Sequence, residues 1–482
     1  MASIILKKNI VENLKQIDNS DREVLRQTIL GRFFEEPKQR VQKGLALLIA
    51  AILKGCALDG QKWTDPIVTI SERTGPNQPE EIRLQGFLLL STILDATGDE
   101  LSDFYHDLFK FFCETIKDNS AVIRKQTLIC ALSMYVTVED DNLLESFDII
   151  FESLMETFYE TIKENDEDTI EKALEMLHAL TSSKADLFKA TQLTKLIQMF
   201  CTQDVLMSKE LNHVFRETII DIILNIIKSY KSVISKNESI LKKIIEVTFI
   251  LACVKEEERP QDRETVQDAA LYFIREAAIL LPKKKSYPIY KEYLLKMFEN
   301  ESTDVVEGAF LILANLSEGC CEYLRRELPT LMKTYIQKGL ESQHIGIKSA
   351  VFSTLNHFAE FLSPDVLGYH EMILPPMIQS LSTVDQKTLI SNVICLEIFC
   401  DEMDEDILTY IPDLIPKLIE IVDNNDNVIP AKRHAILAIA SCAAVAKENF
   451  ATYASNLAPL LAQLITLKGN VYSGFYNSNI TR

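Results

Sequence analysis

Apolar residues recur at helical spacing along almost the whole chain, in segments of roughly 12 to 20 residues. Short polar stretches such as 18–21, 117–120 and 423–427 separate these segments. The alternating apolar and polar pattern of a β-strand is not found. The pattern therefore predicts an all-α fold built from antiparallel helix pairs.

Four segments in the C-terminal half of the chain carry a proline in a similar apolar setting, at positions 329, 375, 416 and 459. The intervals between successive prolines all fall within the period of about 40 to 47 residues of HEAT and armadillo repeats. Because proline is tolerated in the first turn of a helix, we expect each to mark the start of the first helix of a pair, the A helix.

A second ladder predicts the buried stripe of the other helix of each pair, the B helix. Its apolar pairs are Leu313 and Leu316, Leu355 and Phe358, and Leu396 and Phe399, which recur at the same period as the prolines. Extended backwards, the pattern predicts B helices at 40–54, 80–96, 121–136, 166–181, 209–229 and 263–281. We expect a HEAT-repeat right-handed α-solenoid, a superhelix over 1–468 with about ten full repeats and half a repeat at each end, and an irregular tail at 469–482.

Composition narrows the classes of function. Seventy acidic and fifty basic residues give a formal charge of −20, which disfavours direct binding to nucleic acid. The longest apolar runs, 44–53 and 435–446, fall short of the ~20 residues that cross a bilayer, so no membrane insertion is expected. Ten scattered cysteines are typical of core residues in a reducing compartment. No catalytic motif or metal-ligand spacing is present, which predicts a protein that is not an enzyme and has no cofactor or metal.

Three consecutive repeats carry a family resemblance. Residues 306–319, VEGAFLILANLSEG, are followed by LESQ at 340–343 and by IKSAVFSTLNHFAEFLSP at 347–364. This succession resembles importin-β (karyopherin-β) nuclear transport receptors, most of all the importin four branch and its fungal relatives. The similarity extends over nearly the whole chain to about residue 468. Members of that family are roughly twice this long, and neither end here has a polar terminal repeat, so we expect an N-terminal fragment.

The resemblance implies two protein-binding arches in a monomer. An N-terminal arch at about 1–140 would hold the GTPase Ran in its GTP form, and outer grooves would take Phe-Gly (FG) nucleoporins. Shuttling between cytoplasm and nucleus, including the nuclear pore and envelope, would follow. Family contacts with Ran lie on early B helices, which corresponds here to Lys7, Lys8, Gln42, Lys43, Arg83 and Gln85.

The second arch, at about 300–468, would hold basic nuclear-localisation signals, with histones and ribosomal proteins as natural cargo. Polar residues of successive B helices should repeat about every 10 Å along a concave wall, where amides can bind a peptide backbone and carboxylates can pair with Lys and Arg. The candidate residues are Glu318, Asn356, Glu360, Glu397 and Asp401. Alternatively, these side chains are only the solvated face of their helices.

A scaffold without a transport role is the other function considered. A HEAT-repeat scaffold of a multiprotein complex, such as a phosphatase scaffolding subunit, would show more uniform repeats. The intervals between the prolines here are unequal, which favours the transport receptor.

Overall fold

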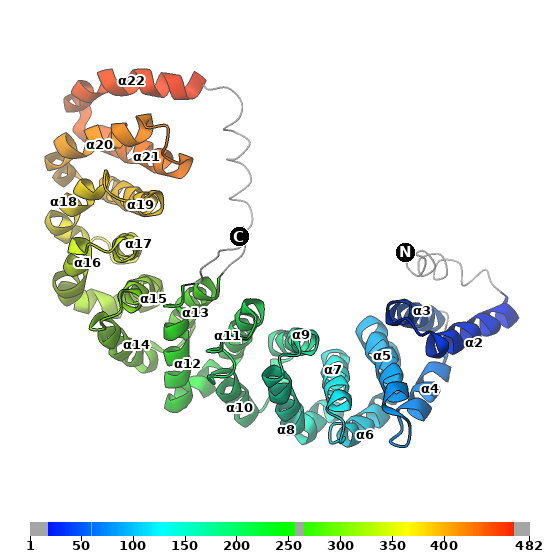
Figure 1. Cartoon of the computed structure of the whole chain (residues 1–482). Coiled ribbons are helices and arrows are strands. Elements are labelled where there is room, and N and C mark those ends of the chain that lie inside the picture. Colours follow the sequence, from blue (N-terminus) through cyan, green and yellow to red (C-terminus); the bar gives the residue numbers. More distant parts are fainter. Residues whose placement is uncertain (1–17, 59, 256–264, 467–482) are drawn as a thin grey trace. The chain divides into compact units, whose positions relative to one another are not determined.

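The computed structural model describes residues 18–58, 60–255 and 265–466, and all regular elements in these ranges are helical. The chain divides into two compact units, Met1–Ile244 and Ile245–Arg482, and the division falls within helix α12 (Glu238–Leu251). Within each unit, helix pairs follow one another in sequence order (Figure 1). Each pair can bury its apolar faces only against its own partner helix and the neighbouring pairs.

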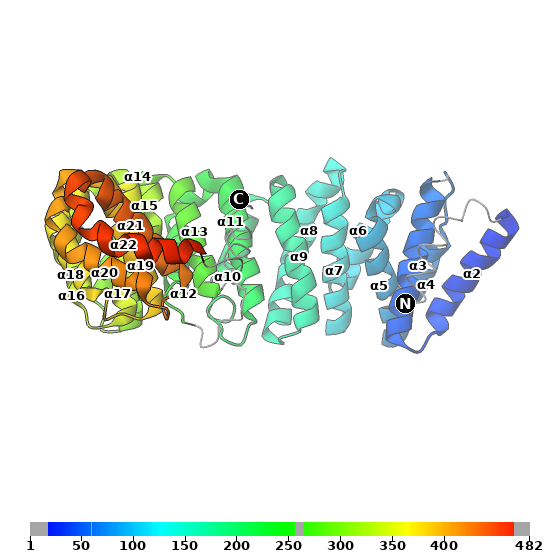
Figure 2. The same cartoon turned by 90° about the horizontal axis from the view of Figure 1, so that it is seen from above.

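The described part of the first unit contains five A–B pairs whose helices lie side by side (Figure 2). The B helices α3, α5, α7, α9 and α11 contact one another in that order, more extensively than the A helices do. Short 3-10 segments, η2 (Gly98–Phe104) and η3 (Ala185–Leu187), join some of the pairs. The pairs are α2 (Asn19–Glu35) with α3 (Gln39–Leu58), α4 (Asp65–Thr74) with α5 (Glu80–Thr97), α6 (Tyr105–Thr115) with α7 (Ala121–Thr137), α8 (Asp141–Lys163) with α9 (Glu167–Ser183), and α10 (Ala190–Phe200) with α11 (His213–Lys236).

The second unit has the same organisation, with the B helices α13, α15, α17, α19 and α21 in contact in that order. Helix α15 holds one B helix and the start of the next A helix, which meet at Cys320 where φ is −115° and ψ is 15°. The A helix then continues through the π-helical turn η4 (Met332–Ile336) into α16 (Gln337–Glu341). The remaining elements are α13 (Val266–Leu280), α14 (Lys283–Phe298), α15 (Thr303–Leu331), α17 (Ile345–Phe361), η5 (Leu367–Tyr369), α18 (His370–Ser380), α19 (Gln386–Glu402), η6 (Glu405–Thr409), α20 (Ile411–Asp423), α21 (Ile429–Ala446), η7 (Lys447–Phe450) and α22 (Ala451–Thr466).

The predicted all-α repeat architecture is confirmed. Counting α12 with α13, the described residues form ten pairs followed by the single helix α22. Each of the six predicted B ranges overlaps an observed B helix, α3 to α13 in turn. The half repeat expected at the N-terminus falls on residues 1–17 and the predicted tail on 469–482, both outside the described residues. The six apolar residues of the predicted B-helix stripe are all 0% exposed.

The predicted position of the prolines was wrong by more than one turn. Pro375 and Pro416 are each the sixth residue of their A helix, and Pro288, which the sequence pattern had not included, is the sixth residue of α14. Pro329 and Pro459 also lie inside helices. A proline there leaves one carbonyl, four residues earlier, without its helical N–H. All five prolines are exposed, so water can satisfy that carbonyl on the solvent side of the helix.

Among the described residues, two segments, Gln39–Leu58 and Ile429–Ala462, are long and apolar enough to cross a membrane by length and composition alone. In the first, which is helix α3, 56% of the apolar window is buried inside the first unit. The side chains of α3 that pack there include Ile49, Ile52 and Cys56. The apolar character of α3 is therefore accounted for by its packing between α2 and α5.

Candidate protein-binding surfaces

The five residues proposed to hold a basic peptide lie on three consecutive B helices of the second unit. Glu318 is on α15, Asn356 and Glu360 are on α17, and Glu397 and Asp401 are on α19. Glu360 and Asp401 are exposed, and the other three are partly buried. The repeat period thus brings these side chains to neighbouring helices, at comparable positions near the C-terminal half of each.

Four of the five also bridge to an adjacent B helix. Arg275 Nε of α13 donates to Glu318 Oε2 at 2.8 Å, and Asn356 Nδ2 donates to the Ser391 carbonyl of α19 at 3.5 Å. Glu397 contacts His434 Nδ1 of α21, and Ser441 Oγ of α21 donates to Asp401 Oδ1 at 3.1 Å. This arrangement was not expected from the sequence, which predicted only a solvent-facing row. The residues form a polar seam that joins one repeat to the next.

These bridges leave capacity for a cationic ligand. Arg275 and Glu318 have side chains that are 47% and 34% exposed, and such a surface pair contributes only about 0 to 1 kcal/mol. A Lys or Arg of a bound peptide could therefore replace Arg275 as the partner of Glu318, or share Glu318 with Arg275, at little cost. Each carboxylate can accept several hydrogen bonds, so Asp401 can keep Ser441 and still accept another donor. Glu360 makes no ion pair or side-chain hydrogen bond within the described ranges.

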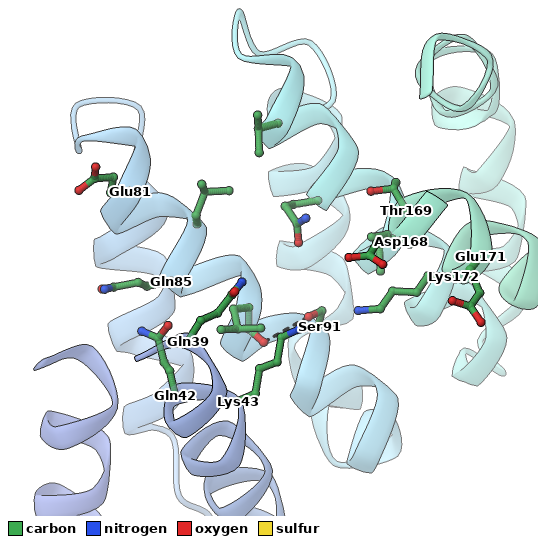
Figure 3. Close-up of a pocket in the computed structure, with 15 residues that line it drawn as sticks. Gln39, Gln42, Lys43, Glu81, Gln85, Ser91, Asp168, Thr169, Glu171 and Lys172 are labelled. Atoms are coloured by element: carbon green, nitrogen blue, oxygen red, sulfur yellow. Dashed lines mark hydrogen bonds between the residues drawn. The ribbon is translucent and has the colours of Figure 1, made fainter. Parts of the chain in front are cut away.

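In the first unit, four B helices line a concave groove of about 560 Å³. Gln39, Gln42 and Lys43 come from α3, and Glu81, Gln85 and Ser91 come from α5 (Figure 3). Lys43 and Lys172, the latter from α9, extend into the groove from opposite sides (Figure 3). Three of the residues proposed to contact Ran, namely Gln42, Lys43 and Gln85, therefore lie on one surface.

The structure gives Arg83 an internal role, which corrects the surface role expected of it, and gives Gln42 an internal bond in addition to its place in the groove wall. Gln42 is 6% exposed and its Nε2 donates to the Phe33 carbonyl at 3.2 Å. Arg83 is 7% exposed; its Nε donates to the Thr74 carbonyl at 3.3 Å and its Nη2 to Asp118 at 2.6 Å. Both are the fourth residue of a B helix and donate to a carbonyl near the end of the preceding A helix. The last carbonyls of a helix have no N–H partner within that helix.

The bridge from Arg83 to Asp118 joins the second pair to the third. Burial, the largest single influence, would raise the pKa of Asp118, but hydrogen bonds from Arg83 and the Ser120 N–H outweigh it and lower that pKa. Lys125 makes the next bridge, to Asp166 at 2.9 Å and Glu164 at 2.7 Å. These ionic contacts at the A–B turns fix the stacking of the pairs and so position the groove.

Sequence reasoning missed the α7 and α9 residues of the groove, among them Gln126, Asp168 and Lys172. A signal for them existed, because Lys43, Gln85, Gln126 and Lys172 follow one another at steps of about 40 to 47 residues, which is the repeat period itself. The other two residues proposed to contact Ran, Lys7 and Lys8, lie outside the described residues.

A second groove, of about 400 Å³, lies between the A helices α8 and α10 of the first unit. Its lining is largely apolar, with Phe151, Met155 and Tyr159 from α8 and Leu196 and Met199 from α10. Tyr159 is held in place by a 2.9 Å hydrogen bond from its hydroxyl to Asp204. Such a groove can accept a small apolar or aromatic side chain from a partner.

Within the described ranges, no group of three or more His, Cys, Asp or Glu side chains is placed to hold a metal ion. The cysteines described there are all reduced thiols, and most are buried. The polar seam, the concave groove and the apolar groove are each suited to binding protein.

Known proteins resemble this chain in sequence and in fold. A family model described as "IPO5-like, TPR repeats" matches residues 37–199. Importin-4 of Mus musculus is 22% identical over 402 residues, which cover 80% of this chain and 36% of that protein. Importin subunit beta-3 of Saccharomyces cerevisiae is 21% identical over 479 residues, which cover 96% of this chain and 42% of that protein. The chain therefore spans less than half the length of these relatives.

The crystal structure of Kap121p shares the fold, with a TM-score of 0.78 and 18% sequence identity over 96% of this chain and 46% of that one. Kap121p bound to RanGTP superposes with a TM-score of 0.79. Observed B helices begin at Gln39, Glu80 and Ala121, and these equal steps lie within the HEAT period of about 40 to 47 residues and exceed the TPR period of about 34 residues. Taken together, the sequence similarity, the repeat period and the fold make this chain similar to importin-β (karyopherin-β) proteins over most of its length.

Proposed function

We propose that this chain is part of a nuclear import receptor that binds basic nuclear-localisation signals, RanGTP and FG nucleoporins as it moves between cytoplasm and nucleus. The observation that carries the proposal is the polar seam on α15, α17 and α19, with acidic or amide side chains on successive B helices. Solved structures of the related Kap121p include complexes with RanGTP, Nup53p and Pho4p, which supports each class of partner.

Basic cargo fits the seam on chemical grounds. An extended peptide presents a backbone group about every 3.3 Å and a side chain to the same face about every 7 Å, so its cations can reach carboxylates on neighbouring helices. Exposed Glu360 and Asp401 are the first carboxylates that such a peptide would meet. Since each exposed ion pair contributes about 0 to 1 kcal/mol, affinity depends on several contacts together. Histones and ribosomal proteins carry the required charge.

We assign RanGTP to the groove of the first unit, within the proposed arch at about 1–140 and its continuation on α9. Lys43 and Lys172 lie among Glu81, Asp168 and Glu171, so the groove offers both signs of charge to a folded partner. We assign FG motifs to the apolar groove between α8 and α10, where a Phe ring could pack on Met155 and Met199.

The proposal is tested with a fluorescent Lys- and Arg-rich peptide titrated with the purified chain. We expect the Glu360→Lys/Asp401→Lys variant to bind about tenfold more weakly than the wild type, because two attractions become repulsions. Glu371→Lys/Asp413→Lys is the control, since it makes the same change of charge on exposed residues of the A helices α18 and α20. Equal weakening by the control would show a general effect of net charge and would remove the seam from the proposal.

Ran binding is tested by pull-down with Ran loaded with GTP or GDP. The receptor should retain Ran-GTP preferentially, and Lys43→Glu/Lys172→Glu should reduce retention while Lys195→Glu on α10 should not. A chain that shows no nucleotide preference and no affinity for the basic peptide would favour a HEAT-repeat scaffold.

A further inference from the structure

Two cysteines meet where the last two B helices of the second unit pack together. Cys400 of α19 and Cys442 of α21 are both 0% exposed. Asp401, next to Cys400, accepts the 3.1 Å hydrogen bond from Ser441, which is next to Cys442. Because these neighbours are in direct contact and α19 and α21 contact each other along the seam, the two buried thiols face the same interface. Each thiol also shifts the pKa of the other, as expected for two neighbouring thiols.

We propose that Cys400 and Cys442 form a reversible disulfide between adjacent repeats when the protein meets hydrogen peroxide. The Cys442 thiolate attacks one peroxide oxygen, the O–O bond breaks, and a sulfenic acid and hydroxide result. The Cys400 sulfur then attacks the sulfenic sulfur, the S–O bond breaks, and a second hydroxide leaves. The two thiol protons convert the hydroxides to water, so two thiols are oxidised by two electrons and one peroxide is reduced to two waters. A dithiol reductant reverses the bond by exchange.

The surroundings of the two thiols suit these unequal roles. The interaction with Cys400 lowers the pKa of the Cys442 thiol, and the interaction with Cys442, together with burial, raises the pKa of the Cys400 thiol. Only the thiolate attacks peroxide, so Cys442 is the thiol to be oxidised first and Cys400 is the one that resolves the sulfenic acid. Enclosure favours a small uncharged oxidant such as hydrogen peroxide over a bulky disulfide, and a dithiol reaches the bond when the last repeats open locally.

Other cysteines of the second unit are less suitably placed. Cys395 is also fully buried on α19, but it is five positions before Cys400 and so points about 140° away around the helix. Cys320 and Cys321 are neighbours in sequence at the break within α15. The juxtaposition across two helices is specific to Cys400 and Cys442, and a bond between them would close a loop as long as one whole repeat.

The consequence for binding rests on the proposed function. Glu397 and Asp401 flank Cys400 and bridge to the same helix, α21, that carries Cys442. A covalent link would fix the spacing of α19 and α21 and thereby one end of the seam proposed to hold basic peptides. Oxidation would then alter cargo affinity without changing any residue that touches the peptide.

The test uses the whole chain at neutral pH. Hydrogen peroxide is raised until the partly exposed Cys321 is oxidised; remaining thiols are then alkylated in denaturant and peptides are analysed by mass spectrometry. We expect a Cys400–Cys442 linked peptide in the wild type and in Cys395→Ser, its absence in Cys442→Ser, and its loss with dithiothreitol. The linked protein should melt a few degrees higher than the reduced protein.

Recovery of Cys400 and Cys442 as alkylated thiols while Cys321 is oxidised would overturn the proposal, as would a predominant link from Cys400 to another cysteine. The wild-type result does not depend on how well any variant folds. Binding of the basic peptide to the reduced chain is measured separately. A failure of the disulfide therefore leaves the proposed function intact, and a failure of peptide binding leaves the disulfide intact.

Discussion

Gly319 marks a close approach between the backbones of two B helices of the second unit. A Cβ atom added at this position would lie 2.4 Å from the carbonyl carbon and oxygen of Ala278 and 2.7 Å from the nitrogen of Ile279. These are backbone atoms of α13, so no side-chain rotation can relieve the overlap. Gly319→Ala should therefore force α13 and α15 apart by about 1 Å, since non-bonded carbon atoms prefer about 3.5 to 4.0 Å.

The change in the free energy of unfolding caused by Gly319→Ala follows from two opposing effects. Overpacking of a close interface costs about 1 to 3 kcal/mol. Replacing glycine by alanine within a helix returns about 0.5 to 1 kcal/mol through higher helix propensity. Because the overlap is with backbone atoms, we take the upper part of the first range and expect a net destabilisation of about 1 to 2.5 kcal/mol, concentrated in the interface between α13 and α15. Gly31→Ala on α2 is the matched control, because nothing lies within 4 Å of its added Cβ, and it should stabilise the chain by about 0.5 to 1 kcal/mol.

Urea titration followed by circular dichroism would measure the overall effect, and hydrogen exchange would locate it. Repeat arrays open locally, so the amides of α13 and α15 should lose protection in Gly319→Ala while those of α19 and α21 keep theirs. Adding Ala278→Gly should not rescue the variant, because the overlap is with the backbone of residue 278. A Gly319→Ala chain as stable as the wild type, with unchanged exchange in α13, would refute the close approach.

The remaining predictions concern the first unit. Arg83→Met should lower the free energy of unfolding by about 1 to 3 kcal/mol at pH 7, because it leaves Asp118 without its cation and the Thr74 carbonyl without its donor. The pKa of Asp118 is lowered in the folded state, so this stabilisation is present above about pH 4 and fades as pH falls through the folded pKa; urea midpoints at pH 7 and pH 3 should therefore differ less in the variant than in the wild type. Equal pH dependence in both proteins would contradict the assignment. In the apolar groove, Met199→Lys should weaken binding of a Phe-Gly peptide, measured by fluorescence anisotropy, whereas Thr191→Lys, exposed on the same helix but outside the groove, should not.

The motif residues that carried the family resemblance now have a physical explanation. Ser317, Glu318 and Gly319 form the S-E-G part of that motif. Ser317 is fully buried and bonds the Leu313 carbonyl at 3.0 Å, Glu318 bridges to Arg275, and Gly319 lets α13 approach. Glu318 and Gly319 therefore serve the packing of one repeat on the preceding one, whereas the bond of Ser317 lies within α15.

The sequence by itself determined the helix pairs, their period and the apolar stripe of the B helices. Helical periodicity is a local property, and a stack of repeats adds few contacts between distant segments, so the pattern around Leu355 and Phe358 was enough to place them in the core. Even the missed groove residue Lys172 followed the repeat period from Lys43.

Only the tertiary structure decided how each polar side chain of a B helix is used. Gln42 and Lys43 are adjacent in sequence, yet one is buried against an A-helix carbonyl and the other reaches into a groove. Likewise, the partners of Glu318 and Glu397 lie 43 and 37 residues away along the chain. Such pairings depend on the register and separation of packed helices, and backbone approaches like that at Gly319 set these distances. The helical pattern of a single segment contains no information about them.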